Sequence, residues 1–147
     1  MLFRSKRNKT SNAVRIVHEL TGFVATATES RSTKENHLYA LRRLRLKLAT
    51  ELREPIDLAT FAPPDWFLTI RRGTGIEASH RHPLYAATAG LVLDLFAAVN
   101  GNPAAVAINL GVSTTTIVKL LEGEPQLWAA ANRIRAGLGF KPLAHRG

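Results

Sequence analysis

Residues 13–29, AVRIVHELTGFVATATE, and residues 30–50, SRSTKENHLYALRRLRLKLAT, carry the strongest structural pattern in the chain. Two short runs, 13–18 and 23–29, are rich in β-branched side chains and partly alternate in polarity, which is typical of strands. The four residues between them end in Gly22, and glycine accepts a positive φ in a tight connection. The sequence therefore predicts a β-hairpin.

A long helix is predicted after the hairpin, from about Thr33 to Arg53. Ser32 and Glu35 have the spacing of a capping box at its start. Leucines recur at three- and four-residue spacings and predict an apolar stripe, while basic side chains fill intervening positions. The predicted stripe consists of Leu38, Leu41, Leu44 and Leu48. A helix of this length spans roughly 30 Å, enough to place several cations along a phosphate backbone.

Net charge separates this third of the chain from the rest. The 147 residues contain 20 Lys and Arg against 11 Asp and Glu, a formal net charge of +9. Residues 1–53 hold 12 of these cations and 4 acids, whereas residues 54–147 hold 8 and 7. A polyanion, and RNA in particular, is therefore the expected partner of the N-terminal third. A solvated, arginine-rich helix surface is the alternative.

The composition also excludes several classes of protein. The chain has no cysteine, which excludes disulfide scaffolds, thiol catalysis and sulfur-ligated metal sites. His80 and His82 have a metal-like spacing but no obvious third ligand, so no metal or cofactor is expected. The apolar run 84–99 is interrupted by Asp94 and is shorter than the roughly 20 residues of a membrane span. With no secretory pattern at the N-terminus, we expect a cytoplasmic protein without a membrane partner.

The C-terminal part is predicted to be helical. Residues 54–82 are punctuated by Pro and Gly and are expected to be a linker, and residues 83–147 a helical bundle. Helices are expected over 84–99, 104–110 and 114–121, with a fourth beginning at Pro125, and Asn102 and Ser113 are the expected N-caps. Gly111 between the second and third of these has the position of a helix-turn-helix glycine. Packing and DNA recognition both remain open for this pair, because the second helix offers one cation, Lys119.

The order of residues in the N-terminal third resembles a known family. The residues that carry the resemblance are Lys6-Arg7-Asn8-Lys9, Ala13-Val14-Arg15-Ile16, His18, Thr21-Gly22, Arg31-Ser32, Asn36 and Ala40-Leu41-Arg42-Arg43-Leu44-Arg45. Over about residues 6–50 the chain closely resembles the catalytic domain of class I peptide chain release factors, and is nearer to their stand-alone relatives than to full termination factors. The resemblance implies a domain that enters the peptidyl-transferase centre of the ribosome and promotes hydrolysis of the peptidyl-tRNA ester.

One departure from the family concerns catalysis itself. The Gly-Gly-Gln loop of the family aligns with Phe3-Arg4-Ser5, and the strand before that loop is missing. No catalytic residue is therefore assigned, and hydrolysis is expected only if an upstream Gly-Gly-Gln exists. Either the protein begins upstream of Met1, or it is a non-catalytic derivative that keeps the ribosome-facing surface.

The sequence thus predicts an α+β protein: a small hairpin with a long basic helix, a release-factor-like domain over 1–53, followed by a helical bundle with a helix-turn-helix-like pair. The expected function is translation termination or ribosome rescue through binding of ribosomal RNA and tRNA, without codon recognition. The expected RNA-binding residues are Lys6, Arg7, Asn8, Lys9, Arg15, Arg31, Arg42, Arg43, Arg45 and Lys47. A DNA-binding regulator built on the helix-turn-helix is the alternative, and a structural interaction protein is a third possibility.

Overall fold

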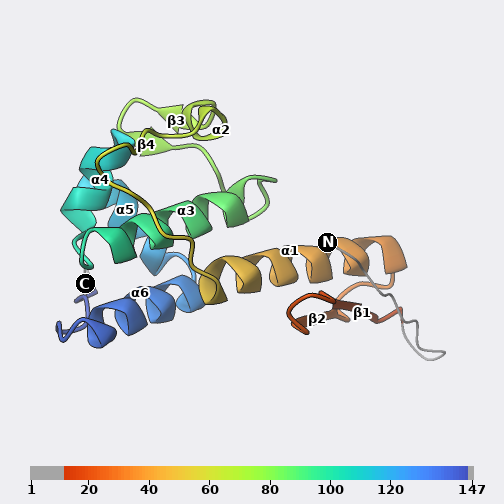
Figure 1. The fold of residues 1–147 in the computed structure, drawn as a ribbon. Helices are drawn as coiled ribbons and strands as arrows, with labels where there is room; N and C mark the ends of the chain where they lie inside the picture. Colours follow the sequence, from red (N-terminus) through yellow and green to blue (C-terminus); the bar gives the residue numbers. More distant parts are fainter. Residues whose placement is uncertain (1–11, 146–147) are drawn as a thin grey trace. The chain divides into compact units, whose positions relative to one another are not determined.

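The computed structural model describes residues 12–145, which form a mixed α+β chain with two small hairpins and six helices (Figure 1). The elements are β1 (Val14–Val17), β2 (Val24–Ala27), α1 (Thr33–Glu51), α2 (Asp65–Leu68), β3 (Arg71–Arg72), β4 (Gly75–Ile76), α3 (Tyr85–Ala98), α4 (Pro103–Leu110), α5 (Thr114–Glu122) and α6 (Pro125–Gly137). The chain divides into two compact units, with the boundary inside α1 between Leu48 and Ala49. We call them the N-terminal unit and the C-terminal unit.

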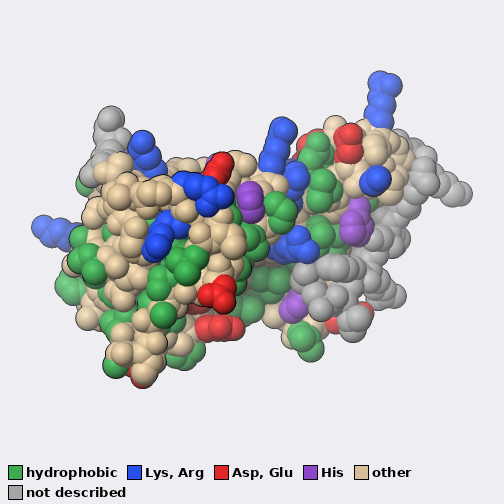
Figure 2. Space-filling view, turned by 90° about the horizontal axis from the view of Figure 1, so that it is seen from above, with side chains coloured by type: hydrophobic (Ala, Val, Ile, Leu, Met, Phe, Trp, Pro, Cys, Tyr) green, Lys and Arg blue, Asp and Glu red, His purple; other side chains and the backbone are tan. Residues whose placement is uncertain are grey.

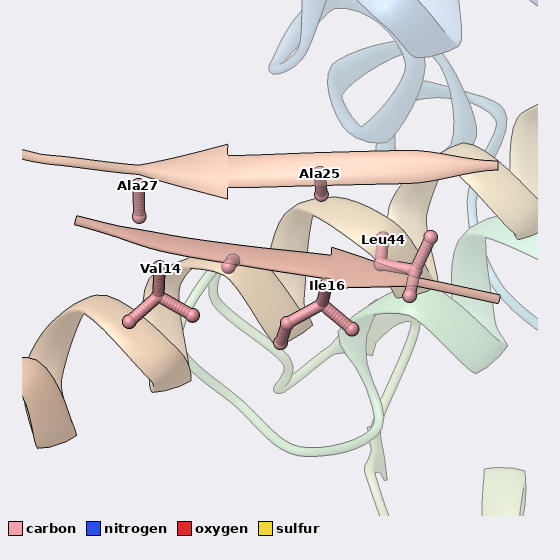
Figure 3. Packing of buried hydrophobic residues seen from close by; sticks show 6 residues of the cluster. Val14, Ile16, Ala25, Ala27 and Leu44 are labelled. Carbon is pink, nitrogen blue, oxygen red and sulfur yellow. The ribbon is translucent and has the colours of Figure 1, made fainter. Parts of the chain in front are cut away.

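The N-terminal unit contains the predicted hairpin and most of the predicted long helix. β1 and β2 pair antiparallel, with Arg15 opposite Thr26, and Gly22 in the connection has a φ of +75°. One face of the hairpin is buried on α1 in a cluster made of Val14, Ile16, Ala25, Ala27, Ala40 and Leu44. In Figure 3 the strand side chains of this cluster point to the side of the hairpin on which α1 lies. The hairpin prediction is confirmed, with strands shorter than the predicted runs.

Three of the four leucines predicted for the apolar stripe of α1 pack toward the hairpin, because Leu44 belongs to the buried cluster and Leu41 and Leu48 pack against it. The side chains that α1 buries against the hairpin are Asn36, Ala40 and Leu44, each 0% exposed. Leu38, predicted in the apolar stripe, is 43% exposed, so that assignment is wrong. Asn36 and Ala40, which the predicted stripe did not include, complete the buried face, and the Asn36 side chain makes three hydrogen bonds there.

Serine side chains hold the start of α1 in a variant of the predicted capping box. The backbone N–H of Glu35 donates to Ser32 Oγ at 3.2 Å, as a capping box requires. The Glu35 carboxylate accepts instead from Ser30 Oγ at 2.6 Å, and Ser30 Oγ in turn accepts from the Ser32 N–H at 3.0 Å. Ser30 therefore relays the contact that the Glu35 side chain would otherwise make directly.

The C-terminal unit contains the four predicted helices, as α3 to α6, within one or two residues of the predicted bounds. The segment 54–82, predicted as a linker, differs from that prediction because it contains α2 and the β3–β4 hairpin. It also contributes Phe67 and Ile70 to the buried core, at 0% and 4% exposure. Aromatic and β-branched residues in a Pro- and Gly-punctuated stretch are the signal that this segment folds.

Asp94 interrupts the apolar helix α3 because it has partners. Its Oδ1 lies 3.0 Å from Arg53 Nη1 and accepts a hydrogen bond from the Glu54 N–H at 3.1 Å. Burial raises the pKa of Asp94, and both of these contacts oppose that rise. Across residues 12–145, no single helix combines the length and the apolar character needed to cross a bilayer; only α4 and α5 added together, bent at their junction, reach that size and composition.

Candidate nucleic-acid interface

A row of basic side chains follows the side of α1 that faces away from the hairpin. Lys34, Leu38, Arg42 and Arg45 recur at spacings of four, four and three residues, so they share one face of the helix. With 3.6 residues per turn, this face lies roughly opposite Asn36 and Ala40. We call Lys34, Arg42 and Arg45, together with Arg31 just before the helix, the cationic strip.

Figure 2 looks down on the N-terminal unit from the side opposite the hairpin, which lies below α1 in Figure 1. Blue Lys and Arg side chains stand along this part of the surface with green hydrophobic side chains between them. From Lys34 to Arg45 the strip extends about 16 Å along the helix. That length matches a short run of phosphates on one nucleic-acid strand.

The four side chains of the strip have no hydrogen bond or ion pair within the described chain, residues 12–145. Arg31, Lys34 and Arg45 are exposed and Arg42 is partly buried. An unpaired guanidinium on a helix surface carries five N–H donors that water alone satisfies, and phosphate oxygens are its best match in geometry and charge. A polyanion could therefore bind the strip without breaking any contact among residues 12–145.

Arg43 differs from its neighbours on α1 because it is used inside the unit. Its Nη1 donates to the Thr26 carbonyl at 2.7 Å, and its Nη2 forms an ion pair with the Glu29 carboxylate. The hydrogen bond from Arg43 holds the pKa of Glu29 below its usual value. Arg43 thus ties α1 to β2, and only part of its donor set remains for an external phosphate.

Two other predicted residues also lie apart from the strip. Lys47 is partly buried, with its Nζ 5.3 Å from the centre of the Phe23 ring, a cation–π contact. Arg15 is exposed on the outer face of the hairpin, opposite Thr26 in the strand register. Because the inner face of the hairpin packs on α1, Arg15 and the strip lie on opposite sides of the N-terminal unit.

The remaining predicted residues, Lys6, Arg7, Asn8 and Lys9, lie outside the described residues. Of the predicted set, the structure therefore places Arg42 and Arg45 on one face of α1, with Arg31 in the loop that precedes the helix. It adds Lys34, which the sequence reasoning missed. The four-residue step from Lys34 through Leu38 to Arg42 is the signal that could have found it, once the inward face of the helix was known.

Asn36 joins the hairpin, the β2–α1 loop and α1. Its Oδ1 accepts from the Ser30 N–H at 2.9 Å, and its Nδ2 donates to the carbonyls of Ser30 and Asn12, both at 2.8 Å. A side-chain amide has four hydrogen-bonding positions, two N–H donors and two acceptor lone pairs, and three of these four are filled in Asn36. Arg31 is positioned by the loop that Asn36 holds.

In the C-terminal unit a short turn joins α4 to α5, the two helices predicted as a helix-turn-helix-like pair. The axes of α4 and α5 are bent by 114°, within the usual range for this motif. Gly111 in the three-residue turn has a φ of +71°, and Arg71 Nη1 donates to the last carbonyl of α4, that of Leu110, at 3.0 Å. Asn102 and Ser113 cap the two helices as predicted. The exposed face of α5 carries Thr114 and a single cation, Lys119.

Residues 12–145 bring no three His, Asp or Glu side chains together as a possible metal site. No protein-family model matches the chain, and neither a curated protein nor a solved structure matches it significantly. The case for function therefore rests on the residues and their geometry.

Proposed function

We propose that this chain is a release-factor-like protein that binds ribosomal RNA or tRNA through the N-terminal unit, in translation termination or ribosome rescue. The observation that carries the proposal is the cationic strip on α1 and the residue Arg31 just before it, whose four side chains have no partner in the described part of the protein. Lys and Arg side chains of this kind contact phosphates, so the binding should depend little on the RNA sequence and should weaken as the salt concentration rises.

The residues on which the family resemblance rests support the proposal, because several of them occupy joints of the unit. Gly22 has a φ of +75°, which other residues adopt only with strain. Thr21 Oγ1 lies 2.8 Å from His18 Nδ1 and accepts from the Phe23 N–H at 3.2 Å, so it fixes the hairpin turn. Asn36 fixes the junction of the hairpin with α1. Matching residues at a turn and at a junction between elements specify a fold more sharply than matching surface charges do.

Binding, and not hydrolysis, is the activity proposed for the residues present. Peptidyl-tRNA hydrolysis in the resembled family depends on Gly-Gly-Gln, whose glycines permit an unusual backbone path and whose glutamine stands beside the attacking water. Phe3-Arg4-Ser5 cannot supply those groups. Hydrolysis is part of the proposal only for a form that carries Gly-Gly-Gln upstream.

Ribosome co-sedimentation of the full chain tests the proposal. The double variant Arg42→Glu with Arg45→Glu should lose most ribosome binding at low salt. A double variant with the same charge change, Arg81→Glu with Lys141→Glu, alters two exposed cations of the C-terminal unit and should retain it.

The salt dependence gives a second measure. Replacing Arg42 and Arg45 by Gln, so that two phosphate contacts are lost, should reduce the slope of log affinity against log salt by about 1.4–1.8. Equal binding by wild type and the Arg42→Glu, Arg45→Glu variant would refute the proposal.

A DNA-binding regulator is the second candidate, and the 114° angle between α4 and α5 is the observation that favours it. Thr114 is exposed at the start of α5, where a recognition helix would meet the major groove. Thr114→Glu places a carboxylate there without disturbing the helix, since an acidic residue is favourable in a first turn. If this candidate is right, Thr114→Glu abolishes retention of duplex DNA in a gel-shift assay while Arg42→Glu leaves it intact.

A further inference from the structure

The β1–β2 hairpin of the N-terminal unit has two outer edges, and the strand register shows which backbone groups lie on each. The His18 N–H donates to the Phe23 carbonyl at 2.8 Å, so these two residues form a hydrogen-bonded pair. Such pairs alternate along an antiparallel register with pairs whose backbone groups point away from the partner strand. Arg15 and Val17 therefore direct their N–H and C=O groups to the outer edge of β1, and the residues opposite them do the same on β2.

The two edges differ in whether the unit uses them itself. On the β2 edge, Arg43 Nη1 donates to the outward-pointing carbonyl of Thr26 at 2.7 Å, so a guanidinium occupies the place of a further strand. On the β1 edge, the backbone groups of Arg15 and Val17 have no hydrogen-bond partner among residues 12–145, where β1 pairs only with β2. An edge of this kind is a template for another strand, and a two-stranded sheet is stabilised by one.

The flank of α1 above the β1 edge is apolar close to the sheet and cationic farther out. At about 100° per residue, Leu41 and Leu48 lie on the side of α1 away from Arg43, which reaches to β2. Both leucines are partly buried against the hairpin cluster. Lys34 and Arg45 follow on the same side of the helix, farther from the sheet. A strand added to β1 would therefore lay its inward side chains beside the two leucines.

Charge is divided unevenly between the two edges. Of the acids in residues 12–48, Glu29 pairs with the guanidinium on the β2 edge, and Glu35 accepts from Ser30 in the β2–α1 loop. Glu19 lies in the connection between the strands. On the β1 side, Arg15 is exposed on the outer face of the hairpin, and the two cations of the α1 flank lie on the same side of the unit. The β1 edge is therefore complementary in charge to an acidic strand.

We propose that the β1 edge binds an extended, acidic segment of a partner protein, which adds antiparallel to β1 as a third strand. Its inward side chains are apolar and pack beside Leu41, and its outward side chains include an Asp or Glu opposite Arg15. Addition of this kind draws affinity from backbone hydrogen bonds and specificity from alternate side chains. A second copy of this chain fits less well, because it would bring like charges together.

Backbone geometry favours a polypeptide at this edge. Arg15 and Val17 present the same two groups at a spacing of about 6.6–6.8 Å, the two-residue repeat of a β-strand. Only another polypeptide strand offers acceptors and donors with that repeat. The inference does not rest on ribosome binding, because its main contacts are backbone groups of β1 and its probe is a peptide.

Fluorescence anisotropy of a labelled peptide, titrated with the full chain, tests the inference. The probe is a short peptide of alternating valine and glutamate, blocked at both ends, and it should bind saturably with a dissociation constant below about 1 mM. Val17→Pro replaces an outward N–H of β1 by a ring and should abolish binding. Val24→Pro makes the same change directly opposite, on the β2 edge, and should retain it. Neither change removes a hydrogen bond between the two strands, and slow hydrogen exchange of the Ile16 amide checks that both variants keep the hairpin.

Two methylated peptides separate strand addition from simple charge attraction. In an antiparallel addition the glutamates lie opposite Arg15 and Val17 and exchange hydrogen bonds with them, so N-methylation of the glutamates should abolish binding. N-methylation of the valines keeps the same charge and leaves the bonded edge intact, so binding should persist. Equal binding of the two methylated peptides, or equal binding by wild type and Val17→Pro, overturns the inference.

The charge of the edge and the identity of its occupant are tested separately. Arg15→Gln should weaken the peptide by up to about fivefold, the value of one cross-strand ion pair. Arg81→Gln, which removes an exposed cation of the C-terminal unit, should leave the affinity unchanged. Sedimentation of the free chain as a dimer that Val17→Pro dissociates would assign the edge to a second copy and overturn the acidic partner.

Discussion

Asn36 is the residue whose replacement tests the account of the N-terminal unit most directly. Its side chain is 0% exposed and makes three hydrogen bonds, at 2.9, 2.8 and 2.8 Å, to backbone groups of Ser30 and Asn12. Asn36→Ala removes all three bonds. At about 0.5–1.5 kcal/mol for each, the N-terminal unit should lose about 2–4 kcal/mol of its free energy of unfolding.

Asn36→Asp provides a sharper comparison, because its effect depends on pH. An ionised carboxylate would place a second oxygen against two carbonyls, so the pKa of the new carboxyl is raised in the folded state. A group with a raised folded pKa contributes its stability below the unfolded pKa and loses it as pH rises through the folded pKa. Asn36→Asp should therefore be tolerated better in mild acid than at neutral pH, whereas the cost of Asn36→Ala should not depend on this titration.

The assay must report on the N-terminal unit alone. Both tryptophans, Trp66 and Trp128, belong to the C-terminal unit, so their fluorescence does not follow the hairpin. Native-state hydrogen exchange of the backbone amides in residues 14–17 and 24–27 reports on the hairpin directly. Asn36→Ala should speed this exchange by about 30-fold to 700-fold, the equivalent of the expected loss. The control Asn109→Ala, which removes one side-chain bond within α4, should leave it unchanged. An acceleration below about threefold would refute the reasoning.

Two further predictions concern backbone conformation and a surface ion pair. Gly111→Ala and Gly139→Ala both introduce a side chain at positive φ, at a cost of about 1–2 kcal/mol each in unfolding free energy. Gly111→Ala should cost about 1 kcal/mol more than Gly139→Ala, because its Cβ would lie 2.5 Å from Arg71 Nη1 and displace that group from the end of α4. This extra cost should vanish when Arg71 is also replaced by Ala. If the extra cost persists in the double variant, Arg71 is not its cause. Arg43→Ala should raise the pKa of Glu29 toward its usual value, followed by NMR titration of the carboxyl carbon, because the hydrogen bond that lowers this pKa is lost. Because the pKa of Glu29 is lowered in the folded state, the ion pair stabilises the fold above the unfolded pKa, and this stabilisation is lost as pH falls through the folded pKa. An unchanged titration curve of Glu29 in Arg43→Ala would show that Arg43 does not cause the lowered pKa.

Local sequence signals predicted most of the elements. Partly alternating polarity in two short runs, joined by a connection that ends in glycine, identified the β1–β2 hairpin. N-cap residues located the starts of α4 and α5 to within one residue. The segment 54–82 could not be resolved in this way. Its strands have two residues each and α2 has four, so no periodic pattern develops, and Phe67 and Ile70 become buried only through contacts with helices distant in sequence.

The cationic strip was predictable in part. Charge density marked α1 as a binding helix, but it could not separate Arg42 and Arg45 from Arg43, since all three lie within four residues. What separates them is a tertiary contact: Arg43 reaches the Thr26 carbonyl and the Glu29 carboxylate, which are close only after the hairpin has folded onto the helix. A cavity lined by residues 75–80 and α5 had no local sequence signal, because its two walls come from segments about 40 residues apart.

The rotation of α1 connects the fold to the proposed function. Leu41, Leu44 and Leu48 of the predicted stripe pack toward the hairpin, but Leu38 lies on the outer face of the helix with Lys34 and Arg42. A rotation of the helix that buried Leu38 would carry Lys34 and Arg45 toward the edge of the apolar contact, where a cation loses water. Asn36 prevents this rotation, because its amide finds three backbone partners in only one orientation. A buried polar residue thus specifies which cations face outward. If the proposed RNA binding is right, loss of Asn36 should reduce it even in conditions where the unit remains folded.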